Sequence, residues 1–417
     1  MSNKLMSRFL VALLLAFLAS PVSAGERSYT FYNIFYPFCG FDPMTEATDV
    51  NDSGVVTGYF LTEDCTQVHG ITWINGVMTD LDDTYPDGVF RGAQAISRDG
   101  VILGTSFVEE VLVLRDDVVE PLPVPPGCEE HEVASDMNDA GTMAVGSCDR
   151  NGSGLSVPSV YWIDEGISLA LDLLPGLPDD ATGEARGVND AGVVIAKIDG
   201  EARAYTWIDG EITEIPNLVG GTGIGVSAIN NHNLIVGEAE VEDGSLPAMS
   251  YDLNTGVMTI LGPGRADAVN DRGSAVGLVI LDFTDVHAML YEGGEAIDLS
   301  PFFPAVLADD AGAEAINNYG WIVGCAEEWG NGPLHGWLLV PEYDKGDYDG
   351  DTDVDHQDFQ HFQRCFAAEP YPNGMLHVGC SVFDFDDDVD LDLEDYAAFQ
   401  SAFTGPTAPN NNPNGPG

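Results

Sequence analysis

A short pattern that recurs seven times is the feature of this sequence that most constrains its fold. The first copy reads Ala47-Thr48-Asp49-Val50-Asn51-Asp52-Ser53-Gly54-Val55-Val56-Thr57-Gly58. Later copies are centred on Ser97, Asn138, Asn189, Asn230, Asn270 and Asn317, at spacings of 40 to 51 residues. Repetition at this spacing indicates an architecture of similar units, each of which packs on its neighbours.

Each part of the pattern has a physical reason in a β-hairpin. Asn tolerates left-handed backbone angles and Gly reaches positive φ without steric cost, so the Asn-Asp-x-Gly core predicts a turn between two apolar strands. Asn233 replaces the glycine in the fifth copy, and the other copies have Gly54, Gly100, Gly141, Gly192, Gly273 and Gly320. Small residues before the turn suit strands crowded around an axis; these are Ala47, Ala93, Ala134, Ala185, Ala266 and Ala313.

A second hairpin follows each turn. Segments such as 69–81, 204–212 and 287–299 alternate apolar and polar residues around a glycine turn, which is typical of two paired strands. Two hairpins per unit make a four-stranded blade of about 40–45 residues. The sequence therefore predicts an all-β, seven-bladed β-propeller over residues 25–341, with a β-solenoid as the structural rival. The last unit lacks a fourth strand, and a strand within residues 28–35 would complete it and close the ring.

These units resemble the HAF repeats of extracellular bacterial proteins over residues 46–340. The resemblance implies a propeller-like fold and an exported protein, and it implies no defined activity. His287-Ala288 keeps the His-Ala opening of that repeat, whereas Gly follows His69 and His335. Because these three histidines occupy equivalent positions, we expect them to be structural, like the recurrent Trp and Tyr residues of the blade cores. No nucleophile elbow, His-Glu-x-x-His motif or phosphate-binding loop occurs, so no catalytic residue is assigned.

Two acidic loops near the C-terminus carry the clearest chemistry. Residues 347–358 read DYDGDTDVDHQD, and residues 384–395 read DFDDDVDLDLED. Each loop precedes a segment with aromatic residues at helical spacing. The two copies stay in register through Phe359 and Tyr396, Phe362 and Phe399, and Phe366 and Phe403. This duplication opposes the alternative of a solvated acidic linker, which lacks buried aromatic residues.

Calcium takes six to eight oxygen ligands, and an EF-hand-type loop supplies them from positions 1, 3, 5, 7, 9 and 12. We therefore predict a small α-helical module that binds two Ca2+ ions. Its ligands would be Asp347, Asp349, Asp351, Asp353, Asp355 and Asp358 in the first loop, and Asp384, Asp386, Asp388, Asp390, Asp392 and Asp395 in the second. Position 6, usually Gly, is Thr352 or Val389, and position 12 is the short Asp. Both departures should weaken binding, and more so in the second loop.

Residues 346–403 resemble type I dockerin modules, which pair two calcium loops that each end in Asp and run into a helix. The resemblance implies docking to a cohesin domain in assemblies that degrade polysaccharides. Loop positions 10 and 11 face the cohesin in that family. Here they are His356-Gln357 and Leu393-Glu394, which differ from the common Ser-Thr pair and from each other. These residues argue against two interchangeable contacts, and the expected partner is a cohesin-like or cell-surface protein.

The first 24 residues have the layout of a secretory signal peptide. Lys4 and Arg8 give a positively charged segment that precedes an apolar run at residues 9–18. Val22-Ser23-Ala24 has the small residues of a cleavage site. We expect an extracellular mature chain without a transmembrane segment; a retained anchor is the alternative. Loss of Lys4 and Arg8 would move the net charge from −55 to −57. Such a charge disfavours nucleic acid and anionic membranes and favours a soluble monomer.

Seven cysteines fall in the part expected to be exported, where disulfides form. The predicted pairs are Cys39 with Cys65, Cys128 with Cys148, and Cys365 with Cys380. The first two pairs each flank a repeat unit, and the third lies between the acidic loops. Cys325 is left over, with a closure to Cys39 as the alternative.

The expected order is a signal peptide (1–24), a propeller (25–341), a dockerin-like module (342–403) and a disordered tail (404–417). The preferred function is non-enzymatic: the propeller is a binding or structural platform, and the module docks it to an extracellular partner. The alternative is an extracellular polysaccharide-degrading enzyme, a glycoside hydrolase acting on O-glycosyl bonds or a lyase, with its site on one propeller face.

Overall fold

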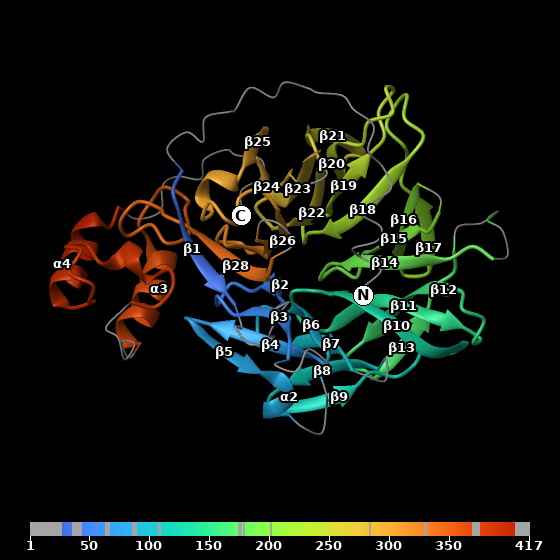
Figure 1. Cartoon of the computed structure of the whole chain (residues 1–417), viewed down its shortest axis with the longest axis horizontal. Coiled ribbons are helices and arrows are strands. Elements are labelled where there is room, and N and C mark those ends of the chain that lie inside the picture. The colour runs from blue at the N-terminus through green and yellow to red at the C-terminus, as the bar shows by residue number, and fades with distance from the viewer. Residues whose placement is uncertain are drawn as a thin grey trace.

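The computed structural model describes residues 27–35, 44–62, 67–85, 90–106, 110–173, 177, 180–200, 202–282, 285–328, 332–368 and 376–404. These residues form seven four-stranded antiparallel sheets around a common axis, with a small helical module at the edge of the ring (Figure 1). The predicted seven-bladed β-propeller with a C-terminal helical part is therefore confirmed. The predicted signal peptide, Cys39, Cys65 and the tail beyond residue 404 lie outside the described residues.

Each blade runs from an innermost strand to an outer one. The strands of blades 1 to 3 are β2 (Thr45–Val50), β3 (Val56–Leu61), β4 (Val68–Ile74), β5 (Val77–Asp80), β6 (Gly92–Ile96), β7 (Ile102–Thr105), β8 (Val111–Arg115), β9 (Val118–Pro121), β10 (Cys128–Met137), β11 (Met143–Arg150), β12 (Ser156–Trp162) and β13 (Ile167–Ala170). The short helix α2 (Leu81–Thr84) follows β5.

Blades 4 to 6 repeat this order, and blade 7 is composite. Their strands are β14 (Gly183–Val188), β15 (Val194–Ile198), β16 (Arg203–Ile208), β17 (Glu211–Glu214), β18 (Ile224–Ile229), β19 (Leu234–Ala239), β20 (Ala248–Asp252), β21 (Val257–Gly262), β22 (Arg265–Val269), β23 (Ala275–Asp282), β24 (Asp285–Glu292), β25 (Glu295–Asp298), β26 (Ala311–Ile316), β27 (Ile322–Glu327) and β28 (Leu334–Pro341). A 3-10 turn, η1 (Ser300–Phe302), follows β25. Blade 7 is completed by β1 (Tyr29–Ile34), which pairs with β28 from Tyr29 opposite Pro341 to Ile34 opposite Gly336. The predicted closing strand is thus confirmed.

The recurrent small residues explain how the inner strands come together. The six alanines before the turns are at most 2 % exposed. A β-bulge follows each of them, as between Ala47 and Asp49 and between Ala313 and Ala315. The bulge brings a carbonyl of the inner strand against the glycine that ends the motif. A Cβ on Gly58 would lie 2.0 Å from the Glu46 carbonyl oxygen, so a larger residue at Gly58 would force the backbone to shift.

The motif asparagines link neighbouring blades, which corrects the reason given for them from the sequence. The left-handed position is the glycine, at φ +75° in Gly54, and Asn233 takes φ +64° in the fifth copy. In every copy that has asparagine except Asn138, the motif asparagine instead accepts hydrogen bonds from its own turn and donates to the next blade. Asn230 Nδ2 donates to the Asn270 carbonyl oxygen at 2.8 Å, and Asn317 Nδ2 donates to that of Asn51 at 3.0 Å. The same residue type thus closes the turn and joins the blades.

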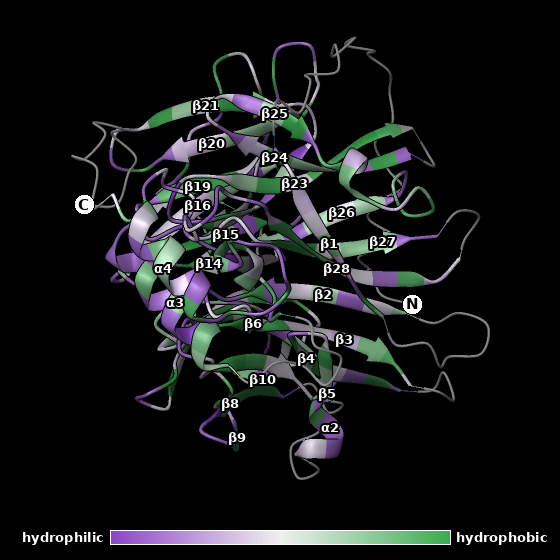
Figure 2. Cartoon of the chain, turned by 90° about the vertical axis from the view of Figure 1, so that its left-hand side faces the viewer, coloured by the Kyte–Doolittle hydropathy of each residue, from purple (hydrophilic) through white to green (hydrophobic). Residues whose placement is uncertain are grey.

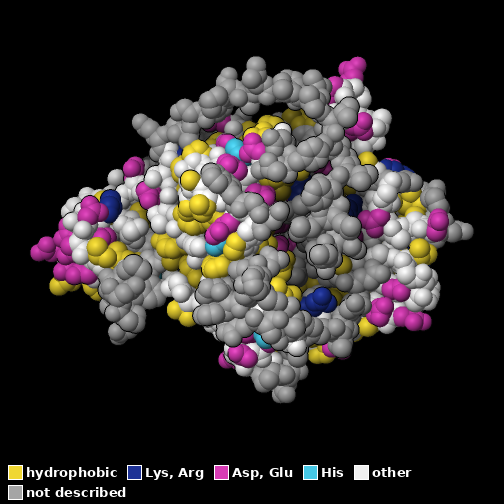
Figure 3. All heavy atoms as spheres, viewed as in Figure 1, with side chains coloured by type: hydrophobic (Ala, Val, Ile, Leu, Met, Phe, Trp, Pro, Cys, Tyr) yellow, Lys and Arg dark blue, Asp and Glu magenta, His cyan; other side chains and the backbone are white. Residues whose placement is uncertain are grey.

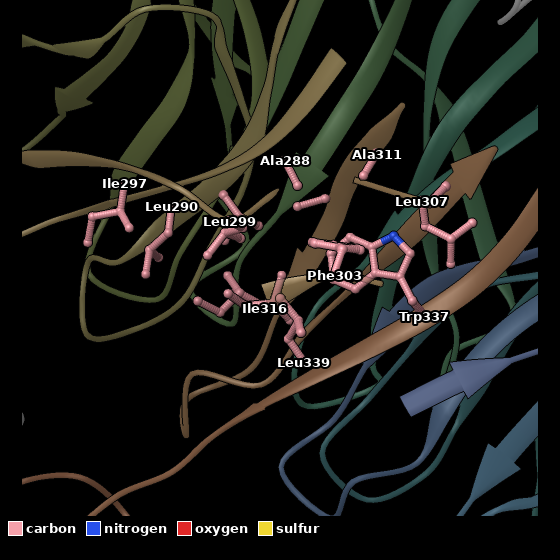
Figure 4. Close-up of a cluster of buried hydrophobic side chains, with 14 residues drawn as sticks. Ala288, Leu290, Ile297, Leu299, Phe303, Leu307, Ala311, Ile316, Trp337 and Leu339 are labelled. Atoms are coloured by element: carbon pink, nitrogen blue, oxygen red, sulfur yellow. The ribbon is translucent and has the colours of Figure 1, made fainter. Parts of the chain in front are cut away.

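Most blades share hydrophobic clusters with their neighbours, and the strands hold most of the hydrophobic residues (Figure 2). The largest cluster joins blades 6 and 7, where Trp337 is fully buried and meets Phe303 edge-on at a centroid distance of 4.8 Å (Figure 4). Burial of such aromatic side chains is a main source of stability. Two predicted disulfides, Cys128–Cys148 and Cys365–Cys380, are present, and Cys325 is buried in β27.

The recurrent histidines have structural partners on an adjacent strand. His69 Nδ1 lies 2.9 Å from an Asp80 oxygen, and His287 Nδ1 lies 2.7 Å from an Asp298 oxygen. Blade 4 has an arginine at the equivalent place, where Arg203 pairs with Glu214 at 2.7 Å. At this position a side-chain hydrogen-bond donor on the third strand of a blade pairs with a carboxylate on the fourth strand.

The His287–Asp298 pair should make stability pH-dependent. Its hydrogen bond to Asp298 raises the pKa of His287. Burial acts to raise the pKa of Asp298, but the hydrogen bond from His287 outweighs it and lowers that pKa. The pair then stabilises the fold fully below about pH 6.5, and this stabilisation is lost as the pH rises through the raised pKa of His287. It is also lost in acid, as the pH falls through the lowered pKa of Asp298.

The change in Tm caused by Asp298→Asn should therefore be larger at pH 6 than at pH 9. Glu214→Gln is the matched control, because Arg203 does not titrate in this range and its effect should stay constant. Scanning calorimetry of the three proteins measures both differences. An Asp298→Asn effect as constant as that of the control would contradict the assignment.

The helical module has its own aromatic core. It consists of α3 (His356–Ala367), the 3-10 turn η2 (Cys380–Phe383) and α4 (Leu393–Ala402). Phe362, Phe383 and Phe399 pack together at centroid distances of 5.0 to 5.9 Å and are at most 2 % exposed. In the described part of the chain, no helix has the length and apolar character needed to cross a membrane.

Candidate metal centre

The first acidic loop is folded around the carboxylates at its two ends. Asp347 accepts hydrogen bonds from the backbone N–H groups of Gly350, Asp351 and Thr352 at 2.7 to 3.2 Å. Asp358 accepts from Tyr348 at 2.7 Å and from Asp355 at 2.8 Å. The carboxylates at positions 1 and 12 therefore fix the backbone of the loop. The aspartates between them can then point toward a common centre.

The second acidic loop repeats this pattern in register. Asp384 accepts from the N–H groups of Asp388 and Val389 at 3.2 and 3.1 Å. Asp395 accepts from Phe385 at 2.7 Å and from Asp392 at 2.9 Å. The same loop geometry thus arises from two different sequences, which supports a common role.

Position 6 adopts the backbone conformation that normally calls for glycine. Thr352 has φ +76° and Val389 has φ +71°. β-Branched residues rarely take positive φ, and such positions cost about 1–3 kcal/mol each. The loops keep this turn although neither has the glycine that would relieve it.

The ends of both loops also start the helices. Asp355 caps α3, and Asp392 caps α4, each in a reciprocal capping box with the aspartate three residues later. A negative charge at a helix N-terminus is favourable because the macrodipole is positive there. Cys365–Cys380 then ties α3 to η2, so the disulfide joins the two halves of the module.

The side chains of the first loop gather in the way a hard cation requires. Carboxylate oxygens of Asp347, Asp349 and Asp351 lie within 4.8 Å of one another, as do those of Asp353, Asp355 and Asp358. Asp349 is only 4 % exposed, and its Oδ1 is buried with no hydrogen-bond partner. A buried carboxylate oxygen without a donor is costly unless a cation neutralises it. The donor set, all oxygen and mostly anionic, fits Ca2+.

The charges of the first loop also favour a bound cation. Burial, reinforced by the neighbouring Asp351 and Asp358, raises the pKa of Asp349 to about 7. Burial also raises the pKa of Asp347 to about 6. These carboxylates are held close together at an energetic cost that a divalent cation would reverse.

The second loop is more open. Oxygens of Asp384, Asp386 and Asp395 lie within 4.8 Å of one another, with Asp384 and Asp395 buried. By contrast Asp386, Asp388 and Asp390 are exposed. Repulsion between the neighbouring aspartates raises the pKa of Asp390. In the first loop all the predicted ligands except Asp351 are buried, whereas in the second loop only Asp384 and Asp395 are.

The sequence did not reveal that the first loop lies against the propeller. Tyr319, in the inner turn of blade 7, meets Tyr348 edge-on at 5.3 Å and is hydrogen-bonded through its hydroxyl to His361 Nε2 at 3.0 Å. Arg272, in the equivalent turn of blade 6, donates to the Asp349 carbonyl oxygen. The available signal was a large side chain at this place, since His232, Arg272 and Tyr319 stand where earlier copies have smaller residues, Ser53, Asp99, Ala140 and Ala191.

A different cluster lies on the inner strands of blades 1 and 7 and on the second strand of blade 7. Ligand atoms of Glu46, Glu314 and Cys325 lie within 4.8 Å of one another, and the Tyr59 hydroxyl donates to Glu46. Burial and the negative charge of Glu46 raise the pKa of Tyr59. No sequence pattern singled out these residues, because they occupy repeat positions that vary between blades.

Comparison with known proteins agrees with the fold. No protein-family model matches the sequence, and no curated protein matches it. An oligogalacturonate lyase in complex with manganese aligns with 76 % of this chain and 96 % of its own at 10 % identity, with a TM-score of 0.51. The β-propeller domain of the trilobed protease from Pyrococcus furiosus aligns with 72 % of this chain and 94 % of its own at 10 % identity, with a TM-score of 0.46.

TolB from Acinetobacter baumannii aligns over 59 % of this chain at 15 % identity, with a TM-score of 0.40. The match spans 63 % of that TolB chain, less than two thirds of its length. At such identities the likeness is one of fold alone. The alignment with the oligogalacturonate lyase agrees with the β-propeller fold described above.

Proposed function

We propose that this is a secreted calcium-binding protein whose dockerin-like module attaches a propeller platform to an extracellular partner. The observation that carries the proposal is the buried, unpartnered Oδ1 of Asp349 within a ring of carboxylates. The repetition of the same backbone pattern in the second loop supports a second ion. Export is expected from the layout of residues 1–24 and is consistent with the two disulfides.

The outer half of the module is the surface proposed for docking. Leu393 is 72 % exposed and Val389 is 51 % exposed, beside the exposed carboxylates of Asp386, Asp388 and Glu394. Figure 3 shows acidic side chains gathered over the outer edge of the module, at the left. Apolar side chains within an acidic surround suit a protein partner with an apolar pocket and a basic rim, such as a cohesin-like domain.

Equilibrium dialysis of the mature chain against 45Ca2+ tests the proposal. We expect two ions per chain and complete release by a chelator, with a loss of module helicity by circular dichroism. Partner capture from the cell surface should require calcium. A chain that retains no calcium at millimolar concentration would refute the proposal.

Glycine at position 6 should strengthen calcium binding. Thr352→Gly and Val389→Gly each remove a Cβ from a left-handed residue that the folded loop must adopt. Because calcium binding requires this backbone conformation and glycine adopts it without steric cost, we expect a roughly threefold to tenfold gain in affinity, or about 1 kcal/mol.

Thr352→Ala and Val389→Ala are the matched controls, since alanine keeps the Cβ and most of the strain. Titration calorimetry of the five proteins compares them directly. Equal affinities for the glycine and alanine variants would show that backbone strain does not limit binding.

A second candidate is a polysaccharide-degrading enzyme with its site on a propeller face. It is favoured by the proximity of Glu46 and Glu314, which come from different blades. Retaining glycosidases place two carboxyl groups about 5–5.5 Å apart. Turnover of a panel of polysaccharides, including polyuronates, that disappears in Glu314→Gln but persists in Glu238→Gln would favour the enzyme.

A further inference from the structure

Three propeller blades hold the module. Arg272 of blade 6 donates to the Asp349 carbonyl oxygen, and Tyr319 of blade 7 is hydrogen-bonded to His361. On blade 1 the Asn75 side chain accepts from the backbone N–H of Val378 at 3.1 Å. Val378 and Trp321 also share a hydrophobic cluster with residues of blades 1 and 7. The module is thus packed on the propeller beside the blade that closes the ring (Figure 1).

One peptide unit connects the propeller to the first residue of the acidic loop. The carbonyl of Asp349 accepts from the Arg272 guanidinium. The N–H of the same peptide unit, which belongs to Gly350, donates to Asp347 Oδ1 at 2.7 Å. A cationic donor on the carbonyl polarises the peptide and strengthens its N–H as a donor. Arg272 therefore acts on the position-1 carboxylate without touching it.

A second path reaches the last residue of the loop. The ring of Tyr348 stacks on His361 at 4.0 Å with an interplanar angle of 8°, and it meets Tyr319 edge-on. The backbone N–H of Tyr348 donates to Asp358 Oδ1 at 2.7 Å. The backbone segment that the propeller contacts, residues 348–350, thus donates hydrogen bonds to the carboxylates of both Asp347 and Asp358.

The second loop has no such connection. Its equivalents of Tyr348 and His361 are Phe385 and Ala398. Among the residues that the structure describes, no hydrogen bond joins the loop 384–395 to a propeller blade. The exposure follows this difference: Asp349 and Asp355 are buried, whereas Asp386 and Asp392 are exposed. The two loops therefore share one pattern of backbone hydrogen bonds, but the first is packed on the propeller and the second is exposed to solvent.

We infer that the first loop is a calcium-dependent clamp between the module and the propeller, and that only the second loop and α4 are free to meet an outside partner. The inference rests on the proposed calcium binding. Linkage makes the coupling reciprocal: propeller contacts raise the affinity of the first loop, and calcium in that loop strengthens the attachment to blades 6, 7 and 1. The module then engages its partner in one orientation.

The test first inactivates the second loop, so that only the first binds calcium, and then removes the contacts between the first loop and the propeller. In the mature chain with Asp384→Ala, which silences the second loop, calorimetry measures the calcium affinity of the first. Adding Arg272→Met or Tyr319→Phe should weaken that affinity at least about fivefold, the lower range of measured couplings. Arg115→Met is the matched control, because Arg115 also donates to a turn carbonyl, that of Gly141, on a distant blade. It should leave the affinity unchanged.

The same substitution is also tested in a chain whose first loop, and not its second, has been inactivated. With Asp347→Ala the second loop alone binds, and Arg272→Met should not change its affinity. Calcium binding that is unaffected by both Arg272→Met and Tyr319→Phe in the Asp384→Ala chain would overturn the clamp and leave the proposed calcium function intact. Absence of calcium binding in the Asp384→Ala chain, despite native circular dichroism, would refute the first site itself.

Discussion

Replacing Asp347 by alanine should remove one of the two calcium ions. Asp347 organises three backbone N–H groups and supplies the position-1 carboxylate. Hydrogen bonds to a charged group contribute about 1.5–3 kcal/mol each, so losing this centre should weaken the first site by a factor of about 100 or more. Asp384→Ala should have the same effect on the second ion, as measured by equilibrium dialysis.

Asp344→Ala is the control for this change, since it removes an equal charge from an exposed position just before the loop. It should leave both ions bound. If Asp344→Ala and Asp347→Ala weakened binding equally, calcium would be attracted by the general charge of −55 and not held by a defined site.

Replacing Asn230 by alanine should destabilise the propeller strongly. Its Oδ1 accepts from the N–H groups of His232 and Leu234 at 3.0 and 2.9 Å, and its Nδ2 donates to the Asn270 carbonyl oxygen. The residue is 5 % exposed, so alanine leaves buried polar groups unpaired at about 1–3 kcal/mol each. We expect a loss of about 2–5 kcal/mol, a large part of the stability of a typical domain. Denaturant unfolding followed by tryptophan fluorescence measures it.

Asn138 provides a matched comparison, because its Nδ2 bonds to Thr142 Oγ1 in its own turn and not to the next blade. Its Oδ1 still accepts from two backbone N–H groups, those of Thr142 and Met143. Asn138→Ala should therefore cost less than Asn230→Ala. Equal losses would mean that the asparagines act only within their own turns.

Much of the fold could be predicted because each copy of the repeat shows the same requirements for small residues and for positive φ. The positive φ at Gly54 and Asn233 and the burial of the motif alanines follow from residue size and backbone freedom. The role of the motif asparagine was mistaken, because its partner lies in another blade, about 40 residues away. An amide at the same place in six of the seven copies, with Ser97 the single exception, is the signal that could have revealed that partner.

The two acidic loops were predictable from the sequence, and their surroundings were not. The spacing of aspartates is local, so the loops and their helix caps follow from sequence. Which carboxylates are buried depends on how the module packs, and this is a matter of tertiary contacts. Arg272 and Tyr319 come from repeat turns, where a change of one side chain leaves the periodic pattern intact.

The most direct test of calcium binding is a crystal structure of the mature chain grown with calcium. Two anomalous peaks are predicted, one within Asp347–Asp358 and one within Asp384–Asp395, each with oxygen ligands at about 2.3–2.6 Å. The first should include Asp349 Oδ1, the buried oxygen that has no donor. Loops of unchanged geometry without ions, at calcium concentrations well above those outside cells, would contradict the account.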